Sequence, residues 1–385
     1  MMRPMKLAGG ELLFGRDCLE HLKTLKGTKA FIVTGGSSMR KSGILQEVMD
    51  LLAEAGIKSE VFSGVEPDPL FSTVYRGAEA MKAFGPDVIV ALGGGSAMDA
   101  AKAMWVYYEH PELTKLSDIL PPNPVPKLRK KAIMVCIPST SGTASEVSRS
   151  VVITDDETHA KVGIGSMEMV PDIAICDPRV TVTMPPAITA ETGMDALTHA
   201  LEALVSKRAN YLSHILATAA AKDIIHYLPR AYKDGGNLGY REVMLNASMT
   251  AGLAFTNVSL GIVHSMAHTL GSFFGISHGL ADAVLLPYVM AFNQADECAR
   301  NTYAAFAKEI GANDLVAVIK ELNSTLGIAG SLKELIKDRA AYMEKLDAMA
   351  EMAKKDGCTK TNPVIPGMDE LKALFVEAYS GSRNY

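Results

Sequence analysis

The sequence contains four side chains that commonly bind metal ions: Asp195, His199, His264 and His278. Asp195 and His199 are four residues apart in a segment whose apolar spacing predicts a helix, so both side chains leave the same helix face. His264 and His268 repeat this spacing farther along the chain, and His278 follows them. One carboxylate with two or three imidazoles is a ligand set for Fe(II), Zn(II) or a similar divalent ion.

The same residues have a structural interpretation that needs no metal. A histidine in an apolar segment can be a hydrogen-bonded core residue, and an Asp–His pair at this spacing can simply stabilise a helix. The surroundings favour the metal, because residues 243–281 contain three histidines but no Asp, Glu, Lys or Arg. Buried imidazoles need polar partners, and a bound cation would provide them.

This uncharged stretch is long enough to raise the question of a membrane span. A transmembrane helix is apolar almost continuously over about 20 residues. Here Asn246, Thr250, Asn257 and Ser259 interrupt the apolar pattern together with the histidines. We therefore expect buried helices in the core of a large protein and no membrane partner.

Composition sets the broad class of the protein. The chain has 385 residues, 48% of them hydrophobic and 21% charged, which predicts two domains with a large buried core. A net charge of −5 without any basic run argues against a nucleic-acid partner. The first residues lack the apolar region of a signal peptide, and five scattered cysteines suit reduced thiols, so we expect a cytoplasmic location.

The first half of the chain alternates between short apolar strands and helices. Strands are predicted at residues 29–34, 59–62, 87–92 and 132–138. Such alternation indicates a mostly parallel sheet with right-handed crossovers. From about residue 185 the strand pattern disappears and long helical patterns follow, for example at 217–227 and 315–322. We predict a Rossmann-like α/β domain over residues 1–182 and an all-α domain over residues 183–385.

Two polar loops follow predicted strands of the first domain. Gly94, Gly95 and Ser96 open a helix, where glycines let a phosphate approach the backbone and the helix N-terminus provides free N–H groups. A plain tight turn would look similar, and the loop is not the GxGxxG fingerprint. The second loop, residues 139–145, is rich in hydroxyls. At the carboxyl ends of parallel strands, where ligands collect, the two loops together predict dinucleotide binding.

Several of these motifs together resemble the iron-containing (group III) alcohol dehydrogenase family, over nearly the whole chain. The matching segments are ALGGGSAMDAAK at 91–102, IPSTSGTASEV at 137–147, MPPAITAETGMDALTHALE at 184–202, GIVHSMAHTLG at 261–271 and HGLADAVLLP at 278–287. The resemblance implies that Asp195, His199, His264 and His278 bind one divalent ion, Fe(II) in the first place, with Zn(II) possible. It also implies that His268 lies just outside this ligand set, near the substrate and the nicotinamide.

The resemblance also implies a cofactor site and a fold like that of dehydroquinate synthase. The predicted cofactor-binding residues are Gly36, Ser37, Ser38, Asp68, Gly94, Gly95, Ser96, Asp99, Thr140, Ser141, Thr143, Ser150 and Lys161. Asp68 and Ser150 depart from the family pattern, because each replaces an Asn found in other members. The phosphates are expected at Gly94, Gly95 and Ser96.

Gly36 bears on the choice of cofactor. Members that prefer NAD tend to carry at this position an Asp that binds the ribose 2′-hydroxyl and repels a 2′-phosphate. Here Gly36 is followed by Ser37, Ser38 and the cations Arg40 and Lys41. We therefore predict a preference for NADP(H), with NAD(H) as the alternative.

The implied reaction is hydride transfer between a nicotinamide cofactor and a primary alcohol or its aldehyde, with the metal polarising the substrate oxygen. His268 is the candidate to relay the hydroxyl proton, although it could instead only orient a metal ligand. Phe255, Leu260, Phe273 and Phe274 suggest an apolar substrate pocket for alcohols from ethanol to butanol or a diol. A homodimer or larger homo-oligomer is expected.

The sequence argues against three alternative enzymes. A dehydroquinate synthase-like lyase would need Lys and Arg for an anionic substrate, and residues 250–278 contain neither. A glycerol dehydrogenase-like enzyme lacks this four-ligand pattern. One half of an aldehyde–alcohol fusion enzyme is not expected, because the chain begins with the dehydrogenase domain itself.

Overall fold

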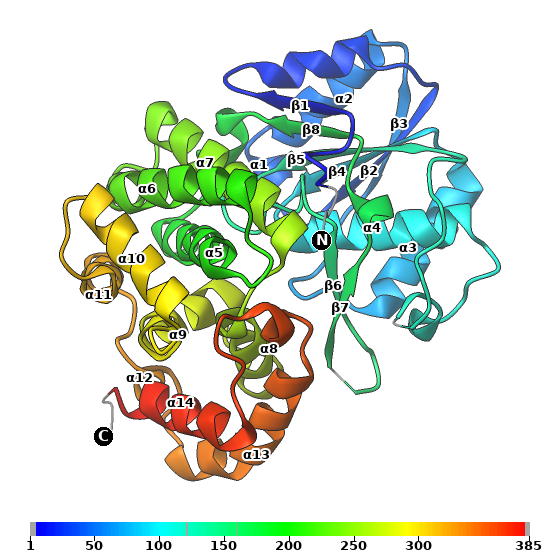
Figure 1. The fold of residues 1–385 in the computed structure, drawn as a ribbon. Helices are drawn as coiled ribbons and strands as arrows, with labels where there is room; N and C mark the ends of the chain where they lie inside the picture. Colours follow the sequence, from blue (N-terminus) through cyan, green and yellow to red (C-terminus); the bar gives the residue numbers. More distant parts are fainter. Residues whose placement is uncertain (1–4, 121, 159, 382–385) are drawn as a thin grey trace. The chain divides into compact units, whose positions relative to one another are not determined.

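The computed structural model describes residues 5–120, 122–158 and 160–381. Contacts divide the chain into two compact units (Figure 1). Unit 1 comprises Met1–Met184 and Gly235–Met249, and unit 2 comprises Pro185–Asp234 and Thr250–Tyr385. Helix α7 (Leu238–Val258) therefore begins in unit 1 and ends in unit 2.

Unit 1 is built on a six-stranded parallel sheet with the order β1-β8-β5-β4-β2-β3. Its strands are β1 (Glu11–Phe14), β2 (Lys29–Thr34), β3 (Lys58–Phe62), β4 (Val88–Gly93), β5 (Ile133–Pro138) and β8 (Ile173–Cys176). The four predicted strands are confirmed within one residue at each end. The sequence pattern missed β1 and β8, which have only four residues each. It also missed the antiparallel pair β6 (Ser150–Thr154) and β7 (Lys161–Gly165).

Helices cover both faces of the sheet because successive strand side chains point to opposite faces. Ile32 and Val90 face one core, which they share with α2 (Ile44–Glu54). Phe31 and Ile89 face the other core, together with α3 (Phe71–Phe84) and α4 (Gly95–Glu109). The buried central strands are thus apolar on both sides, as expected for a parallel sheet.

Unit 2 is helical, as predicted, and its described residues form no strand. Its longer helices, apart from the end of α7, are α5 (Pro186–Val205), α6 (Tyr211–Lys233), α8 (Ile262–Phe274), α9 (His278–Asn293), α10 (Glu297–Glu309), α11 (Leu315–Thr325), α13 (Arg339–Lys355) and α14 (Met368–Ser380). The short helices are α12 (Leu332–Leu335) and η5 (Cys358–Thr361).

Glycines set the positions of the helices that carry the histidines. Gly275 ends α8 with φ of 65°, a left-handed conformation that glycine adopts without strain, and α9 then begins at His278. Gly279 lets α9 approach α5 closely, because a Cβ there would lie 2.2 Å from the Glu191 carbonyl oxygen. The sequence thus brings the three helices α5, α8 and α9 into contact.

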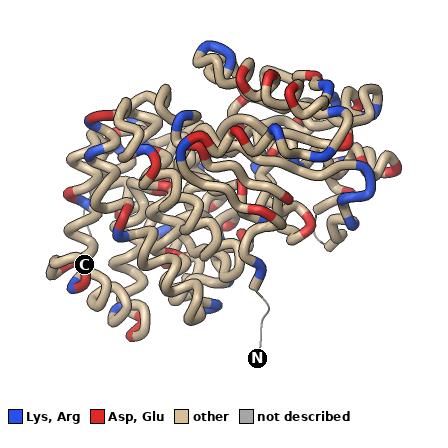
Figure 2. The backbone as a smooth tube through the Cα atoms, turned by 90° about the horizontal axis from the view of Figure 1, so that it is seen from above, with Lys and Arg blue, Asp and Glu red and all other residues tan. Residues whose placement is uncertain are grey.

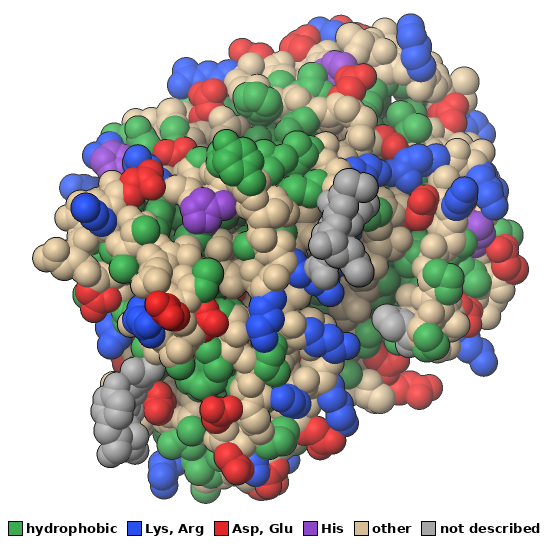
Figure 3. Space-filling model, in the orientation of Figure 1, with side chains coloured by type: hydrophobic (Ala, Val, Ile, Leu, Met, Phe, Trp, Pro, Cys, Tyr) green, Lys and Arg blue, Asp and Glu red, His purple; other side chains and the backbone are tan. Residues whose placement is uncertain are grey.

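The surface carries charges of both signs. In Figure 2, Lys and Arg are interspersed with Asp and Glu over the backbone tube. The face drawn in Figure 3 shows the same mixture, with hydrophobic side chains between the charges. Among the described residues, no helix is long and apolar enough to cross a bilayer.

Candidate functional site

The structure brings the four predicted metal ligands together inside unit 2. Asp195 and His199 lie on α5, His264 lies on α8, and His278 begins α9. The Asp195 Oδ1 atom is 3.6 Å from His199 Nε2 and 3.7 Å from His264 Nε2. The ring of His264 is 4.6 Å from that of His199 and 5.1 Å from that of His278, measured between centroids.

A buried carboxylate that the sequence analysis missed, Asp282, joins this cluster. Its Oδ2 atom lies 3.3 Å from His278 Nε2 and 3.8 Å from His264 Nε2. One ligand atom from each of Asp195, His264, His278 and Asp282 lies within 4.8 Å of all the others, while His199 lies beside this group. The sequence does contain a signal for Asp282, because it follows His278 by four residues, the same spacing as that between Asp195 and His199.

A second missed carboxylate, Glu202, orients His264. Glu202 Oε2 lies 2.7 Å from His264 Nδ1, and its Oε1 accepts a hydrogen bond of 2.8 Å from the Val263 N–H. A proton on Nδ1, shared with Glu202, leaves the Nε2 lone pair directed at Asp195 and Asp282. Carboxylates commonly fix metal-binding imidazoles in this way.

The donor set fits a divalent cation. Asp195 Oδ1, His264 Nε2 and both oxygens of Asp282 are buried, and none has a hydrogen-bond partner in the described part of the chain. Buried polar atoms of native proteins are rarely left unsatisfied, since each costs free energy. Oxygen and imidazole nitrogen are ligands for Fe(II), Zn(II), Co(II) and Mn(II). A cation between these residues would satisfy all four atoms.

The pKa values show how strongly the charges in the cluster interact. Burial alone would raise the pKa of Asp195, but His199, with His264 and His278, holds it well below its usual value. Burial, with Asp195 nearby, raises the pKa of Asp282 well above its usual value. The two carboxylates therefore compete for the positive charge of the imidazoles. A divalent cation would remove that competition.

His268 lies beside the cluster. Its ring stacks on that of His278 with centroids 5.1 Å apart and an angle of 13° between the planes. Its Nδ1 atom lies 2.8 Å from Oδ2 of Asp356, a further residue that the sequence analysis missed. Burial would raise the pKa of Asp356, but the hydrogen bond with His268 lowers it to about 2. Asp356 is therefore a carboxylate that orients His268.

The aromatic residues suggested for a substrate pocket have different surroundings. Phe255 stacks on His199 with centroids 4.3 Å apart, so it borders the cluster. Phe274 instead stacks on Tyr342, and Phe273 is 37% exposed. Among these three, Phe255 is the residue whose ring contacts a predicted ligand.

In unit 1 the two predicted nucleotide loops lie side by side. Strands β4 and β5 are neighbours, with Gly93 opposite Pro138, so their loops leave the same edge of the sheet. A Cβ added at Gly95 would lie 2.6 Å from Cγ2 of Thr143, and one at Gly94 would lie 3.4 Å from Cγ2 of Thr140. A side chain at position 95 would therefore overlap Thr143, whereas one at position 94 would make a close contact with Thr140. Helix α4 begins at Gly95, and the first N–H groups of a helix can bind a phosphate.

Ser141 and Asp99 differ in what they can offer a cofactor. The Ser141 hydroxyl is buried and has no hydrogen-bond partner among the residues described, so it is available to a bound group. Asp99 is already engaged, because it accepts hydrogen bonds from Ser145 Oγ at 2.6 Å and from the Val152 N–H at 2.8 Å. Asp99 therefore ties the hydroxyl loop to α4.

The other predicted cofactor residues fall into two groups. Lys161 on β7 forms an ion pair of 2.8 Å with Asp68, and Ser150 begins β6. Gly36, Ser37 and Ser38 follow β2, the other neighbour of β4, and all three are exposed. A Cβ at Gly36 would meet no atom within 4 Å, so this turn has room for a larger group.

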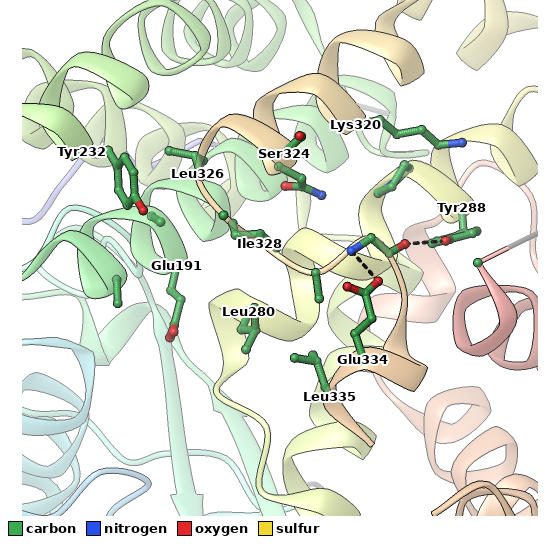
Figure 4. A pocket seen from close by; sticks show the side chains of 18 residues that line it. Glu191, Tyr232, Leu280, Tyr288, Lys320, Ser324, Leu326, Ile328, Glu334 and Leu335 are labelled. Carbon is green, nitrogen blue, oxygen red and sulfur yellow. Dashed lines mark hydrogen bonds between the residues drawn. The ribbon is translucent and has the colours of Figure 1, made fainter. Parts of the chain in front are cut away.

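A separate cavity of about 860 Å³ in unit 2 contains none of the predicted site residues (Figure 4). The Glu334 carboxylate accepts a hydrogen bond from the Gly330 N–H, and the Tyr288 hydroxyl donates to the Gly330 carbonyl. The polar groups drawn there are thus partly used within the protein. The cavity does not change the assignment of the site.

Comparison with known proteins identifies the family. Residues 10–178 match the family described as iron-containing alcohol dehydrogenase, and residues 189–379 match the C-terminal part of the Fe-containing alcohol dehydrogenase family. An NADPH-dependent butanol dehydrogenase of Clostridium saccharobutylicum is 45% identical over 381 residues, which cover 97% of each chain. A bifunctional aldehyde-alcohol dehydrogenase of Escherichia coli is 39% identical over 93% of this chain, which spans 44% of that enzyme.

Solved structures agree. The iron-containing alcohol dehydrogenase of Thermococcus thioreducens has a TM-score of 0.92 and 36% identity, and the match covers 98% of this chain and all of the other. The chain belongs to the iron-containing alcohol dehydrogenase family.

Proposed function

We propose that this protein is a divalent-metal-dependent alcohol dehydrogenase that uses NADP(H) to interconvert short primary alcohols and their aldehydes. The observation that carries the proposal is the convergence of Asp195, His199, His264 and His278, in which the buried Asp195 Oδ1 and His264 Nε2 atoms have no hydrogen-bond partner among the described residues. Family membership supports this alcohol–aldehyde chemistry over the lyase alternative.

Asp195, His199, His264 and His278 would hold the cation, Fe(II) in the first place. When bound, a divalent cation supplies a Lewis acid that lowers the pKa of an alcohol hydroxyl. Glu202 keeps the Nε2 atom of His264 directed at the ligand cluster. Among the described residues, the ion pairs of the cluster join histidines to carboxylates and involve no Lys or Arg. This suits a neutral substrate better than an anionic one.

His268 is the residue that we propose moves the hydroxyl proton. Its Nδ1 atom is held by Asp356, which leaves Nε2 to accept a proton from the alcohol, or to return one to the product of aldehyde reduction. Stacking on His278 fixes the plane of the ring beside the ligand cluster. Asp356 stabilises the imidazolium that forms, because it is a carboxylate at neutral pH.

The nucleotide would bind along the glycine and hydroxyl loops of unit 1. Gly94, Gly95 and Ser96 would bind the phosphates at the start of α4, and Ser141 offers an unused hydroxyl. The open turn at Gly36 supports the preference for NADP(H), and the relative from Clostridium saccharobutylicum is named as NADPH-dependent. We propose that residues 1–182 form the dinucleotide-binding domain and residues 183–385 the metal-binding catalytic domain; within the latter range, Gly235–Met249 packs as part of unit 1.

The substrate that we propose is a short unbranched alcohol or aldehyde such as butanol or butanal. Phe255 provides an apolar ring beside His199, and that relative is named as a butanol dehydrogenase. All five cysteines are free, which supports the expected reducing, cytoplasmic environment. The homodimer or larger homo-oligomer stays a prediction, which sedimentation of the purified protein would test.

The test is reduction of butanal by protein stripped of metal with a chelator. Activity should be absent, should return on anaerobic addition of Fe(II), and should be faster with NADPH than with NADH. Zn(II) in parallel shows whether a second divalent ion also serves.

Each result has a separate meaning. Restored activity that favours NADH would contradict the cofactor preference and leave the enzyme class in place. Full activity of the stripped protein, with less than one metal ion per ten chains, would contradict the metal-dependent function.

A further inference from the structure

We propose that Asp282 binds the metal directly, as a second acidic ligand beside Asp195. This inference rests on the proposed metal site and goes beyond its four predicted ligands. It follows from three observations: where the carboxylate lies, what else contacts it, and how the neighbouring carboxylates differ from it.

The position of Asp282 suits a ligand. It lies one helical turn after His278 on α9 and is fully buried. Its Oδ2 atom is 3.3 Å from His278 Nε2 and 3.8 Å from His264 Nε2. Donor atoms that share one cation at bond lengths near 2.1 Å are roughly 3.0–3.5 Å apart, so these separations are close to those of ligands of a common ion.

Apart from the histidines, the groups that interact with Asp282 among the described residues are the carboxyl groups of Asp195 and Glu202, and neither supplies the positive charge that would explain its burial. Both carboxylate oxygens lack a hydrogen-bond partner in the described chain, and its ion-pair contacts there are with the two metal-binding histidines. Burial of a carboxylate without compensation is costly. A cation in contact with Oδ2 would supply the missing positive charge.

Two neighbouring carboxylates, Glu202 and Asp356, differ from Asp282 in their contacts, and this difference supports the assignment of Asp282 as a metal ligand. Glu202 is also buried near His264, but it contacts the far Nδ1 atom and accepts from the Val263 N–H. Asp356 contacts His268 Nδ1 and accepts from the Cys358 N–H. Both are satisfied within the protein and act through another side chain. Asp282 faces the Nε2 atoms that the metal would share.

A second acidic ligand would change the kind of metal that the site prefers. Asp195, Asp282 and three imidazoles would give five protein ligands, and a substrate oxygen could complete a six-coordinate shell. Fe(II) and Mn(II) accept such a shell, whereas Zn(II) sites in proteins are usually four-coordinate. The chain would thus favour Fe(II) over Zn(II) through ligand number.

The test uses Co(II) as a spectroscopic probe in the intact protein. Metal-free wild type, Asp282→Ala and Asp282→Asn are titrated with Co(II) under anaerobic conditions, and the visible d–d bands and the Kd are recorded. Loss of a ligand lowers the coordination number, so the bands of Asp282→Ala should become more intense and shift. The Kd should rise at least about 100-fold, above the effect typical of residues outside the ligand set. Asp282→Asn serves if the Ala variant does not fold, with a change in the same direction.

Glu202→Gln is the matched control. It should weaken Co(II) binding by about 10–100-fold while keeping the wild-type bands, because it removes an orienting contact and no ligand. Wild-type bands in both Asp282 variants would overturn this inference and leave the proposed function standing. If wild-type protein binds no Co(II), Fe(II) or Zn(II), both the inference and the proposed metal site fail.

Discussion

Buried charged residues serve different purposes in the two units of the molecule. In unit 1, the half-buried Asp99 accepts two hydrogen bonds, and the fully buried Lys102 ammonium donates to the carbonyls of Ser148 and Ser150. In unit 2, Asp282 is as buried as Lys102, but neither of its oxygens has a hydrogen-bond partner among the described residues. A satisfied buried charge holds a fold together, whereas an unsatisfied one indicates a missing ligand.

The two units also differ in which part of the chain recognises the ligand. The proposed nucleotide site at the glycine and hydroxyl loops of unit 1 would use backbone N–H groups, so side-chain volume at Gly95 should matter most there. The proposed metal site would use side-chain atoms, so the chemical type of Asp195 and His264 should matter most there. Mutations should therefore separate the units: changes of side-chain volume should affect the first, and changes of ligand type the second.

The largest effect is expected from Asp195→Ala. Loss of the carboxylate should prevent stable metal binding and lower kcat/KM for butanal by about 1,000-fold, since the Lewis acid contributes several kcal/mol. The rise in Tm that metal addition gives the wild type should disappear, while the metal-free Tm stays within a few degrees. NADPH binding, measured by fluorescence, should be unchanged. Normal metal content in this variant would show that the Asp195 carboxylate is not needed to bind the metal.

Glu146 is a fully buried carboxylate in unit 1, and its burial should make the stability of the protein depend on pH. Burial raises its pKa from 4.5 to about 7. The folded protein thus retains a proton that the unfolded chain loses above pH 4.5, so stability is lost as pH rises from about 4.5 through 7. Glu146→Gln should remove this loss and leave the variant more stable than wild type at pH 8, by up to roughly 3 kcal/mol.

Urea unfolding at pH 5 and pH 8 measures this difference. The two proteins should be similar in stability at pH 5 and should separate at pH 8. If the difference in the free energy of unfolding between wild type and Glu146→Gln were the same at pH 5 and pH 8, burial would not disfavour the ionised form of Glu146 and the prediction would be wrong.

Asp356→Asn tests how the proton-transfer residue is positioned. Without the carboxylate, His268 loses its orienting partner, and kcat should fall by about 10–100-fold, within the range that general acid–base catalysis contributes. Metal content should be unchanged, because the Asp356 carboxylate forms its hydrogen bonds with His268 and the Cys358 N–H, which are not predicted ligands. Steady-state kinetics and metal analysis of the same preparation separate the two effects. Wild-type kcat would argue for a purely structural His268.

Gly95→Ala tests whether added side-chain volume in the glycine loop weakens cofactor binding. The added methyl group would overlap the Thr143 side chain and displace the hydroxyl loop from the glycine loop, so KM for NADPH should rise by about tenfold or more, on the order of 1.4 kcal/mol of cofactor binding. Metal binding should not change. Gly163→Ala is the control, since Gly163 is not a predicted cofactor residue and its methyl group would meet nothing within 4 Å, so KM should stay as in wild type. An unaffected Gly95→Ala would place the phosphates elsewhere.

Gly36→Asp should shift the cofactor preference and leave metal binding unchanged. A carboxylate in this open turn would repel a 2′-phosphate and offer an acceptor to a 2′-hydroxyl. The ratio of kcat/KM for NADPH to that for NADH should fall by about tenfold, or roughly 1.4 kcal/mol. An unchanged ratio would show that the 2′-phosphate does not reach Gly36.

The sequence alone predicted the parts of the molecule that have a local pattern. The buried strands β2, β4 and β5 are apolar runs that end in glycine or hydroxyl loops, and the Asp195–His199 spacing marks one helix face. The edge strands β1 and β8 were missed because four residues are too few for a periodic pattern.

The missed site residues divide in the same way. Asp282 follows His278 by one helical turn and could have been found by searching for Asp as well as His at that spacing. Asp356 could not, because it is separated by 88 residues from its partner His268 and only the tertiary packing of unit 2 joins them. Glu202 lies three residues after His199, but its partner is on another helix.

The location of the metal tests the central claim most directly. Crystals grown anaerobically with Fe(II) should be measured above and below the iron absorption edge, and the anomalous difference map should be examined in unit 2. The account predicts one strong peak per chain, bounded by Asp195, His199, His264 and His278. An active, iron-loaded protein whose peak lies elsewhere, or that shows no peak at these residues, would contradict it.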